Sequence, residues 1–144
     1  MNFNIEQAIG FNLHIAASVM KQSLKAMLKE NQIELTTEEM VLLLLVNEDG
    51  VEQSDLQQKI HKDKTNVTRL LDRLEKKALI MRQMSQTSRR QQIISLTDEG
   101  GQTQKQLVQL IQQFSKQAAK DISPEAYQLV TKSLQKFIQN LTGF

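Results

Sequence analysis

The segment from residue 54 to residue 97 constrains the fold most, because the period of its apolar pattern changes along its length. Apolar residues recur at steps of three and four through 54–61 and 64–77, which predicts two helices. Residues 79–84 and 91–96 are short, contain β-branched isoleucines and flank a polar segment, which predicts a two-stranded hairpin. A helix, a short turn, a second helix and a hairpin are therefore expected in succession.

Positive charge is concentrated in the same part of the chain. Residues 59–90 hold ten Lys and Arg against three Asp and Glu, a net charge of +7. The whole chain carries only +2, so the remaining residues sum to −5. Duplex DNA is the partner that would use such a concentration of positive charge. The pattern therefore predicts a winged helix-turn-helix, in which the hairpin is the wing.

Helices are also predicted on the N-terminal side of this segment. Residues 5–30 carry an amphipathic stripe and are expected to form one long helix, part of whose apolar face would contact another chain. Thr36 and Glu39 match a capping box, in which Thr36 caps a helix over 37–47 and Glu39 reaches back to its start. That helix is apolar almost all round and is expected at the centre of the fold. Ser54 is expected to cap the short helix that follows.

On the C-terminal side, Thr97 is expected to cap a helix over 98–120, and Ser123 with Pro124 to start the last helix. Apart from a few residues at Val51, the hairpin carries the only strand signals. The predicted fold class is mainly α with a small β-hairpin wing, a winged helix-turn-helix with additional N- and C-terminal helices.

The helix over 64–77 presents a polar face opposite its buried stripe. Its N-terminal residues are the candidates for base contacts, because a recognition helix reads base edges with that end. The base-contact candidates are Thr65, Asn66, Thr68 and Arg69, flanked by Arg73. The candidate phosphate contacts are Lys64, Lys76 and Lys77, and the wing tip adds Arg89 and Arg90. Asp72 is expected to pair within the helix with Arg69, Arg73 or Lys76. For this helix alone, an ordinary charged surface exposed to solvent explains the pattern as well as DNA binding does. The combination of two helices with a basic hairpin favours DNA binding.

The order of elements resembles the MarR family of bacterial repressors over nearly the whole chain. The specific part is 64–97, with Lys64–Lys77 similar to the family's recognition helix, then Ala78-Leu79-Ile80, Arg89-Arg90 and Leu96-Thr97 followed by Gly100. The resemblance implies one domain over 1–144, in which a winged lobe of residues 36–97 binds DNA.

The resemblance also implies an assembly and an effector. Residues 1–35 and 98–144 would form the dimerization helices of a homodimer that binds a palindromic operator. Arg90 would enter the minor groove, and a small aromatic acid bound between the dimerization part and the lobe would release the DNA.

Two residues depart from the family pattern. Ala78 stands where the family has Gly, and an Ala at positive φ costs about 1 kcal/mol, so the helix is expected to end differently there. Ser88 stands where the family has an Asp that braces the wing arginine, so a smaller contribution of the wing to affinity is expected.

Other classes of function find little support. The chain has no cysteine, which removes disulfides, thiol sensing and Cys-based zinc sites. His14 and His61 lie on different elements without metal-ligand spacing, and neither a Gly-rich phosphate loop nor a nucleophile motif is present, so no enzyme, cofactor or metal is expected. His14 is a candidate for an effector pocket, although a histidine partly buried beside the core is the favoured interpretation.

The chain is expected to be cytoplasmic, since it lacks an apolar run of membrane-spanning length and the features of a signal peptide. The alternative function is a winged-helix module that binds proteins and not DNA. That alternative needs no basic face, so the +7 segment counts against it.

Overall fold

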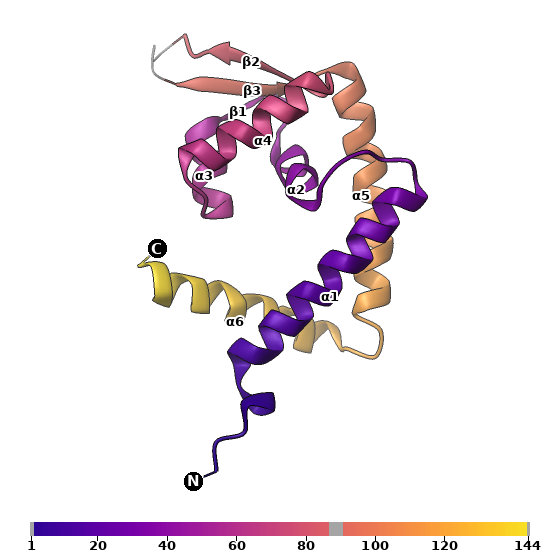
Figure 1. Ribbon diagram of the computed structural model, residues 1–144, viewed down its shortest axis with the longest axis vertical. Helices are drawn as coiled ribbons and strands as arrows, with labels where there is room; N and C mark the ends of the chain where they lie inside the picture. Colours follow the sequence, from indigo (N-terminus) through magenta and orange to yellow (C-terminus); the bar gives the residue numbers. More distant parts are fainter. Residues whose placement is uncertain (1, 87–90, 144) are drawn as a thin grey trace. The chain divides into compact units, whose positions relative to one another are not determined.

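The computed structural model describes residues 2–86 and 91–143. They fall into two compact units, Met1–Leu110 and Ile111–Phe144, which are described separately. The helices are η1 (Ile5–Gln7, a 3-10 turn), α1 (Ile9–Glu30), α2 (Thr37–Leu45), α3 (Gln53–Ile60), α4 (Lys64–Lys76), α5 (Asp98–Ala118) and α6 (Pro124–Thr142), and the strands are β1 (Val51–Glu52), β2 (Ile80–Met84) and β3 (Gln92–Leu96) (Figure 1). The predicted class, mainly helical with a small sheet, is confirmed.

The sheet consists of the predicted hairpin and one additional short strand. Its order is β1-β3-β2, and both pairings are antiparallel. Ile80 pairs with Leu96 at the base of the hairpin, and Val51 of β1 pairs with Ile94. The wing is thereby joined through β1 to the chain that enters α3.

The first unit contains the core, which α2 crosses as predicted. Leu42 and Leu43 of α2 are fully buried, and α4 and β3 bury Leu71 and Ile94 to the same degree. The N-terminal part of α5 belongs to this core, because Leu107 is fully buried and Gln104 donates from Nε2 to the carbonyl oxygens that end α2.

The end of α4 corrects one expectation. Ala78 adopts the left-handed conformation, with φ +60°, so the helix ends as it would with glycine. The Ala78 N–H donates to the Glu75 carbonyl at 2.9 Å, and the Leu79 N–H donates to the Leu74 carbonyl at 3.1 Å. These two bonds make a Schellman motif, and the buried Leu79 and Leu74 supply its usual apolar contact. Satisfying the last carbonyls and burying Leu79 outweighs the cost of an alanine at this position.

The start of α5 packs directly on this turn. Thr97 caps α5 as predicted, because its Oγ1 accepts from the Gly100 N–H at 2.9 Å. The same hydroxyl donates to the Ala78 carbonyl at 2.6 Å. A side chain on Gly100 would place its Cβ only 1.9 Å from the Leu79 carbonyl oxygen. The two motif segments around Ala78 and Thr97 therefore meet in space, and Gly100 allows their close approach.

Several predicted boundaries shift. The helix predicted over 5–30 is interrupted at Ala8, whose backbone is extended, and Asn12 donates from Nδ2 to the carbonyls of Glu6 and Ala8 at this break. Ser54 is not a cap: α3 begins at Gln53, directly after the β1 pairing, and its N-cap is Glu52. The helix predicted over 98–120 ends at Ala118.

Two helices leave apolar residues in solvent. On α1 these are Ile9, Phe11, Leu13, Ile15, Val19 and Met20, and on α6 they are Tyr127, Leu129, Val130, Phe137, Ile138 and Leu141. No residue of α6 is buried among those described. None of the described helices combines the length and the hydropathy needed to cross a membrane.

Candidate nucleic-acid interface

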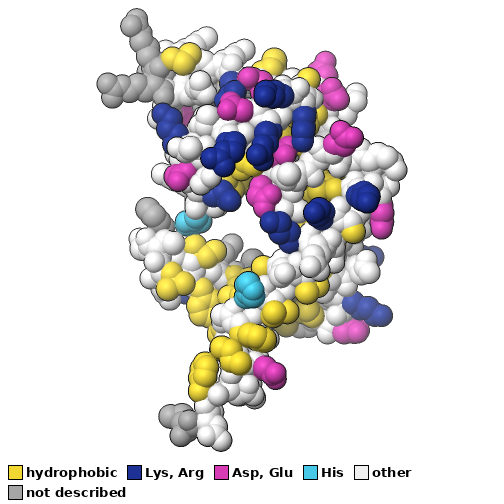
Figure 2. All heavy atoms as spheres, in the orientation of Figure 1, with side chains coloured by type: hydrophobic (Ala, Val, Ile, Leu, Met, Phe, Trp, Pro, Cys, Tyr) yellow, Lys and Arg dark blue, Asp and Glu magenta, His cyan; other side chains and the backbone are white. Residues whose placement is uncertain are grey.

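The structure confirms the two faces of α4. Val67, Leu70, Leu71 and Leu74 are buried. Six of the candidate DNA contacts are exposed on the opposite side: Lys64, Thr65, Asn66, Arg69, Arg73 and Lys76. Figure 2 shows Lys and Arg side chains gathered over the α4 side of the first unit. The predicted base-reading end therefore lies open to a large partner.

The turn before α4 fixes this open end. His61 ends α3 in the left-handed conformation, and Asp63 caps α4 by accepting from the Asn66 N–H at 2.9 Å. Asp63 thus satisfies a backbone donor in the first turn, while the side chains of Thr65 and Asn66 remain exposed. The first turn of α4 is held by its backbone, which leaves its side chains available for a ligand.

Arg82 of β2 binds both acidic residues of α4. Its Nη2 lies 2.6 Å from Asp72 Oδ1 and 3.0 Å from Glu75 Oε1, and its Nε donates to Glu75 Oε2 at 3.1 Å. The expectation that Asp72 pairs within α4 is therefore wrong, because the guanidinium of β2 offers a closer, two-sided partner. The hydrogen bond from Arg82 lowers the pKa of Glu75, and both acids raise the pKa of Arg82.

This cluster changes the charge that α4 presents. Asp72 and Glu75 would repel phosphate if their carboxylates were unpaired, and the positive charge of Arg82 offsets part of their negative charge. The Arg82 side chain is only 16% exposed. It therefore changes the electrostatic potential of the α4 surface more than it offers a direct contact to a ligand. Strand alternation would have identified it, since Arg82 shares a face with Ile80, which is buried.

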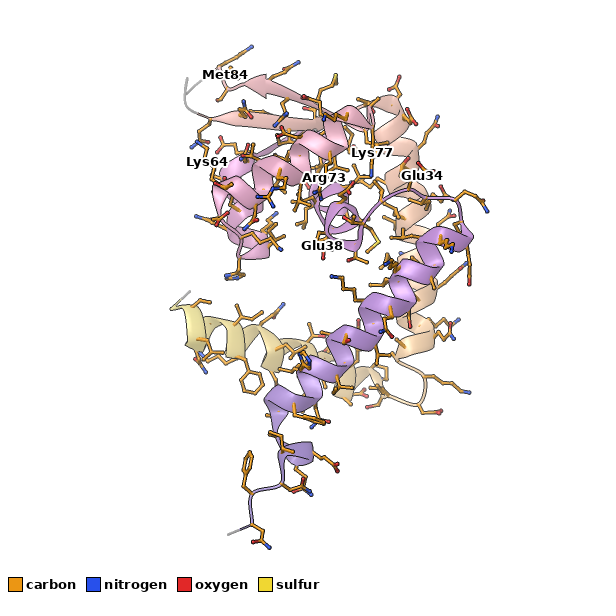
Figure 3. The ribbon with its side chains drawn as sticks, in the orientation of Figure 1. Glu34, Glu38, Lys64, Arg73, Lys77 and Met84 are labelled. Carbon is orange, nitrogen blue, oxygen red and sulfur yellow. The ribbon has the colours of Figure 1, made fainter. Side chains whose placement is uncertain are left out.

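Lys77 has partners within the fold that the sequence did not predict. Its ammonium lies 2.8 Å from Glu39 Oε2 and 2.6 Å from the Glu34 carbonyl oxygen. Figure 3 labels Lys77 after α4 and Glu34 in the segment before α2. The Glu39 side chain is 2% exposed and shares a helix face with Leu42 and Leu43, so leaving its charge unpaired would be costly. Lys77 therefore serves the stability of the fold, and a phosphate contact would have to compete with this pair.

The same pair corrects half of the capping box. Thr36 does cap α2, because its Oγ1 accepts from the Glu39 N–H at 3.1 Å. The Glu39 carboxylate pairs with Lys77 and does not return to the start of its own helix. A charged partner from α4 provides a stronger hydrogen bond than a backbone N–H at the helix start.

Thr68 is half-buried and not fully exposed on the face. Its Oγ1 accepts from Nε2 of Gln53, a buried residue, at 2.9 Å. Both residues line a groove of about 480 Å³ between α3, α4 and the wing strands. The remaining residues around this groove are Ser54, Gln57, Lys64, Arg82, Met84, Gln91 and Gln92. Sequence reasoning missed Gln53, whose place between β1 and α3 gave no periodic signal.

Three expectations concern the wing tip, the effector histidine and a metal site. Ser88, Arg89 and Arg90 of the wing tip lie outside the described residues.

His14 is exposed on α1 and not partly buried, and it does not line a second cavity of about 420 Å³ near residues 31–35. Within residues 2–86 and 91–143, acidic side chains and histidines form no cluster that could hold a metal ion.

Comparison with known proteins places this geometry in a family. Residues 35–91 match the model of the MarR family. Two HTH-type transcriptional regulators of Bacillus subtilis (strain 168), YdgJ and YfiV, are each 30% identical over 72% of the chain. The chain spans 63% and 65% of the length of these two relatives, less than two thirds.

Solved structures share the fold. A MarR-family regulator from Rhodococcus sp. RHA1 superposes with a TM-score of 0.83 at 20% identity, over 94% of this chain and 96% of that one. MepR of S. aureus, solved as a complex with DNA, gives a TM-score of 0.81 at 24% identity, over 96% of this chain and 99% of that one. The helices and the three-stranded sheet agree with these structures, and residues 35–91 of the chain match the MarR family.

Proposed function

We propose that this chain is a transcriptional regulator that binds duplex DNA in a sequence-specific manner through α4. The observation that carries the proposal is the α4 face itself, where Thr65, Asn66 and Arg69 are exposed while Arg82 holds both acids of the helix. Arg suits guanine, Asn suits adenine and Thr can contact either class of base edge. MepR of S. aureus, which shares the fold and was solved in complex with DNA, adds support.

Phosphate contacts would come from the rest of the same face. Lys64, Arg73 and Lys76 are exposed and are proposed to hold the DNA backbone. Arg89 and Arg90, which lie outside the described residues, are proposed as further contacts. Lys77 is omitted, since its ammonium is bound to Glu39.

Selection from a random duplex library followed by mobility shift tests this function. The enriched duplex should bind more tightly than a scrambled one, and binding should weaken between about 50 and about 200 mM salt. Equal affinity for every duplex would exclude specific recognition, and no binding at the lower salt concentration would exclude the function itself.

Two substitutions separate base contacts from phosphate contacts. Arg69→Ala should cost about 1–3 kcal/mol and relax the preference at one operator position. Lys76→Ala should weaken all duplexes alike and reduce the salt dependence. The opposite pattern would reverse the assignment of these two residues.

We further propose that the active form is a homodimer on a palindromic operator and that it represses transcription. The exposed apolar residues of α1 and α6 support dimerization, because burying such side chains removes apolar surface from water. Light scattering should give twice the chain mass of 16.5 kDa. Leu129→Glu on α6 should lower this value toward one chain, whereas Gln128→Glu beside it should not. A wild-type chain that remains at 16.5 kDa at micromolar concentration would exclude the dimer.

The last part of the proposal is release from DNA by a small aromatic acid, with His14 in the binding site. The support is the exposure of His14 on α1, where the imidazole could form a hydrogen bond with a carboxylate. Benzoate titrated into the protein–DNA complex should release DNA from the wild type and less readily from His14→Ala. Release that is equal in both would remove His14 from the site.

A further inference from the structure

We infer that Gln53 is a positioning residue that fixes Thr68 as a hydrogen-bond donor toward an acceptor oxygen or nitrogen of the bound DNA. The inference rests on the proposed function and adds a residue that lies outside the exposed face of α4.

A threonine hydroxyl can accept two hydrogen bonds and donate one. Gln53 Nε2 donates to Thr68 Oγ1 at 2.9 Å, which occupies one acceptor position and turns the hydroxyl proton away from the amide. Gln53 is 8% exposed, so it cannot readily exchange this bond for water. The buried amide therefore leaves the O–H of Thr68 available as a hydrogen-bond donor.

A threonine in a helix can donate its proton to the carbonyl four residues earlier. Thr131 and Thr142 of α6 do so, donating to Tyr127 and Ile138 at 3.0 and 2.6 Å. In the described part of the chain, no acceptor takes the Thr68 proton. This threonine is thus distinguished from those two by an occupied acceptor and an available donor.

The available donor borders the groove between α3, α4 and the wing, which is large enough, at about 480 Å³, to admit part of a nucleotide. Lys64 and Ser54 line the same groove, so the partner expected there is an electron-rich atom. On DNA that atom is a phosphate oxygen or a base acceptor such as guanine O6, and both use the same chemistry.

Gln53→Glu tests the inference with little change of shape. A carboxylate can only accept, so Thr68 would have to donate to it and would lose its donor for DNA. Gln57→Glu is the matched control, because it adds the same charge to the same groove from the same helix, while the hydrogen bond to Thr68 stays with Gln53. Thr68→Val removes the hydroxyl, and Thr68→Ser retains it.

Affinity for the selected duplex is the measurement. Thr68→Val should bind about 2- to 10-fold more weakly, and Thr68→Ser should recover most of the loss. Gln53→Glu should lose more affinity than Gln57→Glu by a similar factor, and adding Thr68→Val to Gln53→Glu should cost nothing further. Relaxed preference at one operator position would identify a base acceptor, and a uniform loss over all duplexes would identify a phosphate.

Two outcomes would overturn the inference while leaving the proposed function intact. If Thr68→Val bound the selected duplex as tightly as the wild type, the Thr68 hydroxyl would make no hydrogen bond to DNA. Independent, additive losses in the double variant would show that Gln53 does not act through Thr68. Failure of the proposed function is distinct, since the wild type itself would then bind no duplex. Melting curves of the free variants exclude a loss caused by unfolding.

Discussion

The winged lobe buries its apolar residues, whereas helix α6 exposes them. Leu71 on α4 in the lobe is fully buried, whereas Leu129 and Leu141 on α6 are 67% and 86% exposed. Both helices show the same apolar spacing in the sequence, so periodicity alone does not tell whether a stripe is covered by its own chain. The core of the lobe is filled by residues of the lobe itself, whereas no residue of α6 is buried among those described.

Matched truncations give the largest effect and test this contrast directly. Leu71→Ala should lower the free energy of unfolding by about 2–5 kcal/mol at every protein concentration, because it leaves a cavity in a closed core. Leu129→Ala should cost little in dilute protein and more as concentration rises, since its partner would be another chain. Urea unfolding at two concentrations provides the measurement. A concentration-independent loss in Leu129→Ala would place its contacts within the chain and break the comparison.

The lobe also depends on one buried charge pair, which α6 lacks in its described part. Lys77→Met should lower the free energy of unfolding by about 1–3 kcal/mol, because it leaves the buried Glu39 carboxylate without its cation. Lys76→Met, one residue earlier and exposed, should stay within about 0.5 kcal/mol of the wild type. Unfolding curves measure stability, and mobility shift measures affinity. If Lys77→Met weakened DNA binding without a change in stability, Lys77 would be a phosphate contact after all.

A smaller effect of opposite sign is expected at the end of α4. Ala78→Gly should raise the free energy of unfolding by about 1 kcal/mol, because Ala78 holds φ +60° and glycine adopts that conformation without steric cost. Gly143, which ends α6 with φ +77°, already adopts positive φ without this steric cost. Ala78→Val should destabilise the same turn. Thermal melts of the three proteins decide the point, and a lower melting temperature for Ala78→Gly would mean that the alanine methyl contributes packing that outweighs its strain.

Periodicity and caps predicted the elements of the lobe because those signals are local. The buried set of α4 and the caps at Thr36 and Thr97 depend on residues within a few positions of one another, and the hairpin joins two strands that follow each other in sequence. The family resemblance added that these elements belong to one known fold, and the match over residues 35–91 confirms it.

The errors fall on contacts between elements. The partners of Asp72, Lys77 and Thr68 are 10, 38 and 15 residues away in sequence, and each belongs to a different element. A helical wheel places a side chain on a face but does not identify which charge the next element brings to that face. The expectation for Ala78 was wrong for a related reason, since tertiary contacts through Leu79 and Thr97 offset its local cost.

The smallest expected effect concerns pH and the acids that Arg82 holds. The hydrogen bond from Arg82 lowers the pKa of Glu75 below its ordinary value of 4.5, so the carboxylate is favoured in the folded state. Its contribution to stability is present above pH 4.5 and is lost as pH falls through the lower folded value. Because the Glu75 side chain is 46% exposed, solvent screening keeps the contribution below about 1 kcal/mol. The wild type should therefore lose slightly more stability than Glu75→Gln between neutral pH and about one unit below that ordinary value. Urea unfolding at the two pH values measures the difference, and Arg82→Gln should reduce it in the same way; a full pH dependence in Arg82→Gln would assign the lowered pKa of Glu75 to another neighbour.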